Sequence, residues 1–98
     1  MKVQIHSIHF DADQKLIDFL QRKLDKLETF YDRIIEGEVF LKLEKDGKNE
    51  NKVTEIKLYI PGENLFAKSN ARSFEAAADS TVEALRRQIK KHKEKLMA

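Results

Sequence analysis

The three histidines are the first side chains of this sequence to consider for metal binding or proton transfer. His6 and His9 are three residues apart, and an odd separation on a β-strand directs two side chains to opposite faces. They could share a metal only if a change of strand phase at Ser7 realigned them. His92 is distant in sequence and lies among cations, which would repel a metal ion. We therefore expect no metal site.

The remaining polar residues form no recognisable catalytic pattern. Asp11 and Asp13 resemble a DxD pair, but helix capping explains these two carboxylates more simply. The sequence has no phosphate-binding glycine loop, serine elbow or HExxH motif. It also has no cysteine, which excludes disulfides, thiolate nucleophiles and cysteine-based zinc sites. We expect a protein that is not an enzyme and that uses no cofactor and no small-molecule substrate.

Positive charge is concentrated at the end of the sequence. Residues 86–98 contain 6 Lys and Arg against 1 acidic residue, whereas residues 1–85 contain 13 against 16. Cations suit the dipole of a helix C-terminus, at about 0.3–1 kcal/mol each, but a group of this size is self-repelling. Such a one-ended asymmetry indicates a polyanionic partner. The cations are Arg86, Arg87, Lys90, Lys91, Lys93 and Lys95.

These cations lie on a long amphipathic helix, predicted over residues 74–96 and capped by Ser73. At 100° per residue its narrow apolar stripe, with Thr81 at the edge, contains Phe74, Ala78, Val82, Leu85, Ile89 and Leu96. About 23 residues of helix span roughly 35 Å, whereas strands of about seven residues span roughly 23 Å. We therefore expect the basic end of this helix to extend beyond the sheet.

Four strands are predicted from alternating apolar and polar residues. The first covers residues 2–9, with a change of phase at Ser7 that a bulge or an early strand end would explain. The second and third are centred on Leu41 and Leu58 and joined by a polar loop with Asp46 and Gly47 as its turn. The fourth covers residues 64–71, and all three glycines are expected in connections.

A shorter helix is predicted between the first two strands. Asp11 is its expected N-cap, with Gln14 completing a capping box, and the helix should end near residue 32. Its apolar face, widened by Ile17 and Phe30, contains Leu16, Leu20, Leu24, Leu27 and Tyr31.

The element order β-α-β-β-β-α predicts an α+β fold with a four-stranded mixed sheet. A helical crossover makes the first two strands parallel, and hairpins make the other pairs antiparallel. Each helix has one apolar stripe, so both should cover the same face of the sheet and leave the other face to water. A length of 98 residues, 41% of them hydrophobic, suits one domain over residues 1–98.

Two further groups of side chains bear on binding. The shorter helix offers Arg22, Lys23 and Lys26, interleaved with Asp25 and Glu28, and taken alone these are ordinary surface ion pairs. They could extend the basic surface, because both helices lie on the same side of the sheet. Phe40 and Tyr59 should point to the open sheet face. They could stack on RNA bases, although cross-strand surface pairing explains them better.

The sequence resembles the ribosome hibernation promoting factor family, which includes ribosome-associated inhibitor A and is often described as sigma-54 modulation protein. The resemblance covers essentially the whole chain. It is carried by three segments, RKLDKLETFYDRI, EIKLYIPGENLFA and EALRRQIKKHKEKL, and the pattern over residues 87–95 is the most specific. The sequence departs from the family at Ser73, Phe74 and Glu75, where an acidic-aromatic pair is usual.

The resemblance implies a fold like a double-stranded-RNA-binding domain. It also implies binding to the 16S rRNA of the small ribosomal subunit, where messenger and transfer RNAs sit, and inhibition of translation in idle or stationary-phase cells. Family members differ after the last helix, and an end at Met97 and Ala98 resembles the short form, which acts with a separate ribosome-dimerising factor. The implied RNA-binding residues are Lys23, Lys26, Arg86, Arg87, Lys90, Lys91, His92, Lys93 and Lys95.

Two other functions remain open from the residues alone. The same electrostatics would suit a general double-stranded-RNA-binding module. A helix-mediated protein or membrane-surface module is disfavoured, because the apolar stripe of the last helix is needed to cover the sheet. No apolar run approaches transmembrane length and the first ten residues lack the apolar block of a signal peptide, so we expect a cytoplasmic protein.

Overall fold

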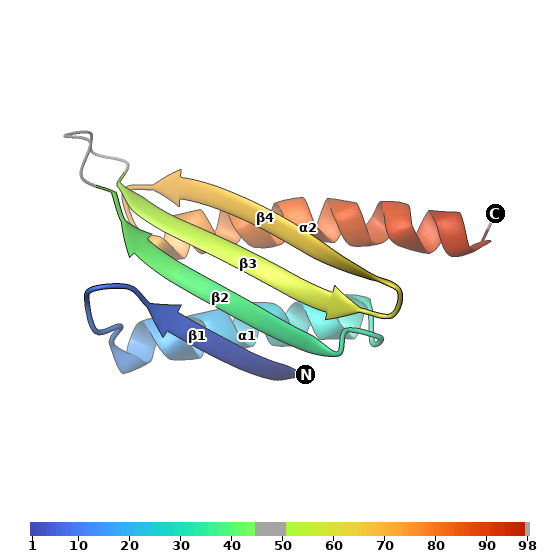
Figure 1. The fold of residues 1–98 in the computed structure, drawn as a ribbon, viewed down its shortest axis with the longest axis horizontal. Helices are drawn as coiled ribbons and strands as arrows, with labels where there is room; N and C mark the ends of the chain where they lie inside the picture. Colours follow the sequence, from blue (N-terminus) through green and yellow to red (C-terminus); the bar gives the residue numbers. More distant parts are fainter. Residues whose placement is uncertain (45–50, 98) are drawn as a thin grey trace.

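The computed structural model describes residues 1–44 and 51–97, which form a four-stranded sheet with two helices behind it (Figure 1). The elements are β1 Lys2–Ser7, α1 Gln14–Phe30, β2 Glu36–Leu43, β3 Lys52–Ile60, β4 Glu63–Ala71 and α2 Phe74–Met97. The strand order is β1-β2-β3-β4, with β1 and β2 parallel and the other pairs antiparallel. The predicted α+β fold and topology are confirmed. Within the described residues, neither helix is long and apolar enough to cross a membrane.

Strand β1 is shorter than predicted, because it ends at Ser7. The backbone N–H of Ile8 still donates to the carbonyl oxygen of Leu41, at 2.9 Å. His9 then adopts a left-handed backbone with φ 66°, which turns the chain away from the sheet. The change of phase in the sequence therefore marks an early strand end rather than a bulge.

The N-cap of α1 is Asp13, so the prediction of Asp11 is wrong by two residues. The Oδ1 of Asp13 accepts a hydrogen bond from the backbone N–H of Leu16, at 2.8 Å. Gln14 is the first residue inside the helix, and its side chain donates to Asp18 at 2.9 Å instead of closing a capping box. An N-cap side chain accepts a hydrogen bond from a backbone N–H two or three residues later, and Asp13 does so from Leu16.

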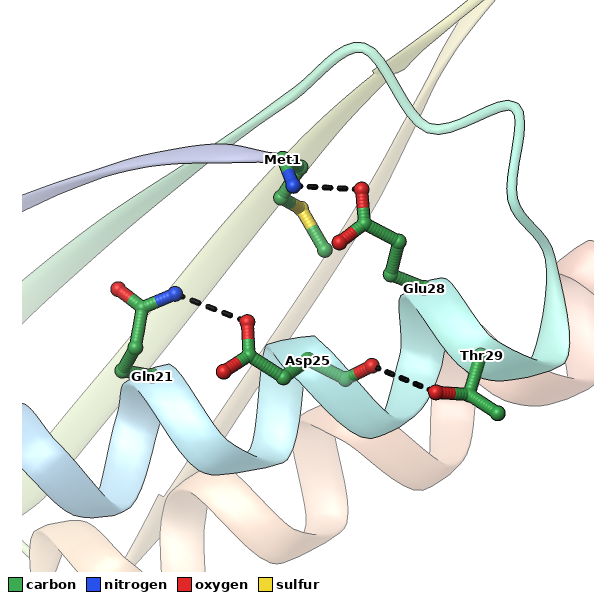
Figure 2. Close-up of polar contacts among 5 residues, drawn as sticks. All are labelled: Met1, Gln21, Asp25, Glu28 and Thr29. Atoms are coloured by element: carbon green, nitrogen blue, oxygen red, sulfur yellow. Dashed lines mark hydrogen bonds and ion pairs between the residues drawn. The ribbon is translucent and has the colours of Figure 1, made fainter.

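The part of α1 from Gln21 onward makes polar contacts within the helix and with the N-terminus of the chain (Figure 2). The side-chain amide of Gln21 donates to Asp25 at 3.0 Å, and the hydroxyl of Thr29 donates to the backbone carbonyl of Asp25 at 3.2 Å. Glu28 pairs with the amino group of Met1, which ties the start of β1 to the end of α1. The carboxylates of Asp25 and Glu28 are therefore both held by contacts within the protein.

Gly37 lies inside β2, whereas the sequence predicted every glycine in a connection. A Cβ at this position would be 3.2 Å from the sulfur of Met1 and 3.4 Å from the side chain of Leu58. The missing side chain therefore allows close packing. Gly62 does lie in a connection, with φ 87°. The predicted turn at Asp46 and Gly47 falls outside the described residues.

A single core lies between the sheet and the helices. Its fully buried members include Leu20, Leu24, Ile56, Leu58, Leu85 and Ile89, which come from both helices and from β3. Two threonines also join α2 to β3: the hydroxyl of Thr81 is 3.2 Å from the carbonyl oxygen of Thr54 and 2.7 Å from that of Ala77. Packing and the contact of Thr81 with Thr54 fix the position of α2 against the sheet, whereas the contact with Ala77 lies within α2.

Candidate nucleic-acid interface

The basic half of α2 lies at one end of the molecule, where it passes the last strand and the end of α1 (Figure 1). Ser73 caps α2 as predicted, its hydroxyl accepting from the backbone N–H of Ala76 at 3.1 Å. The helix has 24 residues against 17 in α1. Leu96 and Met97 are 61% and 86% exposed. The predicted overhang is present but short, because the helix stays in contact with the core as far as His92 and Lys93.

A groove lies between the two helices and contains the two cations of α1 that were predicted to bind RNA. We call it the interhelical groove; it measures about 370 Å³ and is lined by Lys23, Lys26, Leu27, Phe30, Asp79, Val82, Glu83 and Arg86. A neighbouring hollow of about 350 Å³ continues it along α2 to Lys90. The structure therefore brings Lys23 and Lys26 beside the basic half of α2, as the sequence predicted.

Lys23 and Lys26 differ in their availability to a ligand. The Nζ of Lys23 lies 2.7 Å from the Oδ1 of Asp79, and its side chain is partly covered. Lys26 is exposed, and among the described residues it has no ion pair. Lys26 is thus the more available cation of the two.

The ring of Phe30 makes cation–π contacts with two cations of α2. The guanidinium carbon of Arg86 is 4.7 Å from the ring centroid, and the Nζ of Lys93 is 4.6 Å from it. Lys93 also donates to the carbonyl oxygen of Phe30, at 3.3 Å. This carbonyl ends α1, which has no basic residue in its own last turn. Lys93 therefore supplies the positive charge that the negative end of the α1 dipole favours.

Because of these contacts, replacing Lys93 with Gln should destabilise the fold, whereas the same change at Lys90 should not. We expect Lys93→Gln to cost about 1 kcal/mol, from the lost cation–π, dipole and hydrogen-bond interactions. Lys90→Gln at an exposed position should stay within about 0.5 kcal/mol. Urea unfolding of both variants measures the difference. Equal stabilities would show that the contacts of Lys93 contribute nothing.

His92 points inward, between α2, β4 and the end of α1. Its Nδ1 lies 3.1 Å from the Oε1 of Glu63, and its ring meets Tyr31 edge-on, with centroids 5.8 Å apart. The side chain is only 11% exposed. A contact of His92 with RNA stays a prediction, and the structure gives this residue a packing role.

The other predicted cations project from the end of α2. Arg87, Lys90, Lys91 and Lys95 are exposed, and none has an ion pair within the described part of the chain. A hollow of about 250 Å³ toward β4 is lined by Lys91 and Lys95, on the opposite side of α2 from Lys90. We call the available group the basic tip: Lys26, Arg86, Arg87, Lys90, Lys91 and Lys95. It presents positive charge without ion pairs on two sides of α2 and, through Lys26, on the neighbouring α1.

The open face of the sheet has charges of both signs, and they pair with one another. Lys42 pairs with Glu55, and Lys68 lies 3.9 Å from Glu44. The amide of Gln4 donates to Glu36 at 2.9 Å. This face therefore offers a polyanion much less uncompensated positive charge than the basic tip does.

Phe40 and Tyr59 are engaged in cross-strand contacts, which favours the surface-pairing interpretation. Phe40 stacks on His6 with centroids 4.9 Å apart, and Lys57 lies over the ring of Tyr59 at 5.5 Å. The Tyr59 hydroxyl donates to Glu38 at 3.0 Å, and this hydrogen bond lowers the pKa of Glu38, assisted by His6. The same bond raises the pKa of Tyr59.

No cluster of three potential metal ligands occurs among residues 1–44 and 51–97. The functional residues that sequence reasoning missed are Phe30, Asp79 and Glu83. Phe30 was assigned only to the apolar face of α1, and its four-residue spacing from Lys26 was the available signal. Asp79 and Glu83 lie on the predicted long helix, but their position in the groove with Lys23 depends on how the two helices pack.

The sequence and the fold were compared with those of known proteins. The family model described as Sigma 54 modulation protein / S30EA ribosomal protein matches residues 3–97. A ribosome hibernation promoting factor from Pseudomonas putida is 38% identical over 95 residues, covering 97% of this chain and 89% of the relative. One from Escherichia coli (strain K12) is 31% identical over 96 residues, covering 98% and 97%.

Two solved structures share the fold. A ribosomal subunit interface protein from Coxiella burnetii superposes with a TM-score of 0.86 at 19% identity, covering 96% of this chain and 99% of the other. The N-terminal domain of Protein Y from Thermus thermophilus gives a TM-score of 0.80 at 24% identity, covering 94% and 99%. At these identities the likeness establishes the architecture alone.

Proposed function

Because this chain belongs to the Sigma 54 modulation protein / S30EA ribosomal protein family and to the group of ribosome hibernation promoting factors, we propose that it is a ribosome-binding hibernation factor. It occupies the channel of the small ribosomal subunit in which messenger and transfer RNA sit, and so blocks translation in idle cells. It acts in the cytoplasm by binding alone, without catalysing a reaction.

The observation that carries this proposal is the basic tip. Its cations have no ion pair among the described residues, whereas Lys42 and Lys68 on the open sheet face lie beside carboxylates. Phosphate contacts supply most of the affinity of a protein for structured nucleic acid. The 16S rRNA lining the channel is the phosphate-rich surface that the basic tip contacts.

The shape of the molecule supports the same site. The protein measures 46 × 24 × 18 Å, and α2 runs along its long dimension with the cations at one end (Figure 1). A helix whose position is fixed by packing against the sheet presents these cations without a large ordering cost. Such a narrow body with one charged end suits a channel between two RNA walls better than a flat surface.

Competition between purified small subunits and free duplex RNA tests the proposal. A shape that fits a channel should select the assembled subunit, so excess duplex RNA of unrelated sequence should displace labelled protein poorly at physiological salt. Toeprinting or displacement of messenger RNA and initiator transfer RNA then reports whether the channel is the binding site. Equal affinities for duplex and subunit would identify a general double-stranded-RNA-binding module instead.

A further inference from the structure

The side chains that α2 contributes to the interhelical groove change from acidic to basic within one turn, while Lys23 and Lys26 line the groove from α1. Asp79 and Glu83 line the groove on one side of the change, and Arg86 lines it on the other. Lys90 follows in the adjoining hollow. Glu83 and Arg86 are three residues apart, a rise of roughly 4.5 Å along the helix. Basic side chains therefore replace acidic ones along α2 within one turn, and Glu83 lies at the boundary, because it also lines the adjoining hollow.

Asp79 also removes a cation from the groove. Its carboxylate holds Lys23 at 2.7 Å, and Lys23 would otherwise continue the row of positive charge from Lys26. Lys26 lines the same groove, is exposed, and has no ion pair among the described residues. Without Asp79 and Glu83, the groove would be positively charged along its whole length, from Lys23 to Lys90.

We propose that Asp79 and Glu83 are specificity-determining residues that prevent RNA from lying along the interhelical groove and confine phosphate contacts to the basic tip. The proposal rests on the proposed function, because it takes rRNA phosphates as the ligands of the basic tip. In this proposal the two carboxylates act by repelling RNA that lies along the groove, and they make no favourable contact with RNA bound at the basic tip.

The physical reason is the regular spacing of phosphates in a duplex. A nucleic-acid backbone that follows the groove beyond Arg86 must place phosphates beside Asp79 and Glu83, where like charges repel. RNA that crosses α2 near its C-terminal end, at Lys91 and Lys95, avoids both carboxylates, because neither lines the hollow that these two lysines share. Free duplex RNA presents a long row of phosphates that could follow a basic groove. In the proposed complex with an assembled subunit, the two RNA walls of the channel are held apart and contact only the basic tip. The carboxylates should therefore reduce duplex binding more than subunit binding.

The double variant Asp79→Asn, Glu83→Gln tests this inference, because the expected result is a gain of binding. A variant that merely misfolds would be expected to lose binding instead. Removing two repulsive charges and releasing Lys23 should tighten binding to a duplex RNA of unrelated sequence about tenfold at 100 mM salt. Binding to purified small subunits should change less than about threefold, because RNA there does not reach the two carboxylates. Because exposed ion pairs contribute little to stability, the fold should be unaffected. Fluorescence anisotropy against both ligands measures the two affinities.

Two control variants distinguish an effect of where the two carboxylates lie from an effect of the protein's net charge. Asp11→Asn with Glu44→Gln removes the same charge from exposed positions outside the groove and should tighten duplex binding much less. Adding Lys23→Gln to the groove variant should remove part of its gain, because a released Lys23 is expected to contact phosphate.

An unchanged duplex affinity in the groove variant, or an equal gain in the matched control, would overturn the inference. Failure of the unmodified protein to bind small subunits would instead overturn the proposed function. The duplex comparison between groove variant and control would still decide the role of the carboxylates.

Discussion

Replacing Lys90, Lys91 and Lys95 with Gln should weaken binding to small ribosomal subunits by about 10²-fold at 100 mM salt, if each lysine meets one phosphate. All three side chains are exposed and have no ion pair within the described residues. Gln has nearly the same helix propensity as Lys, so the free energy of unfolding should hardly change. The loss should therefore appear in binding and not in stability.

The dependence of this affinity on salt is the sharper measurement. Each phosphate contact contributes a slope of roughly −0.9 in log affinity against log salt, taking the value for duplex DNA. Four to six contacts should weaken binding by the unmodified protein about 10²–10³-fold between 50 and 200 mM salt. The triple variant should lower the slope by up to about three units, and inhibition of cell-free translation should fall in parallel.

The matched control replaces Lys2, Lys15 and Arg72 with Gln. These cations are exposed on β1, in the first turn of α1 and before α2, and they also lack ion pairs among the described residues. The control removes the same charge, so it should lose only the weak long-range attraction. If both triples lose affinity and slope equally, binding follows net charge and the basic tip is not the interface.

Sequence patterns were sufficient for the fold because they are local and agree with one another. The apolar stripe containing Leu85 and Ile89 requires a helix docked on a sheet, and the alternation around Leu41 and Leu58 requires strands with one buried face. With only two helices available, the topology follows. The N-cap was less certain, because Asp11 and Asp13 both precede the helix and only the backbone path selects Asp13.

Charge counting indicated the region of the candidate interface but not the state of each cation. Lys93 reaches the carbonyl of Phe30, 63 residues earlier in the chain, and Lys23 is held by Asp79 on the other helix. Such pairs depend on which flanks of the two helices face one another. A helical wheel locates the buried stripe, but it does not identify the neighbours at the edges of that stripe.

Replacing Leu85 with Ala should cost about 2–5 kcal/mol of unfolding free energy, the range for removing a large apolar side chain from a packed core. Leu85 is 0% exposed and belongs to the core between α2 and the sheet. The position of the basic tip depends on this docking, so the variant should also lose affinity for subunits wherever a measurable fraction is unfolded. Urea denaturation followed by circular dichroism gives the free energy.

Leu96→Ala is the matched control, because it makes the same substitution on the same predicted stripe of the same helix. Leu96 is 61% exposed, beyond the last contacts of α2 with the core, so its truncation should cost less than about 0.5 kcal/mol. The contrast between the two variants measures where docking ends along α2. A loss below half a kcal/mol at Leu85 would mean that α2 does not pack on the sheet, and similar losses at both positions would mean that the helix is covered to its end.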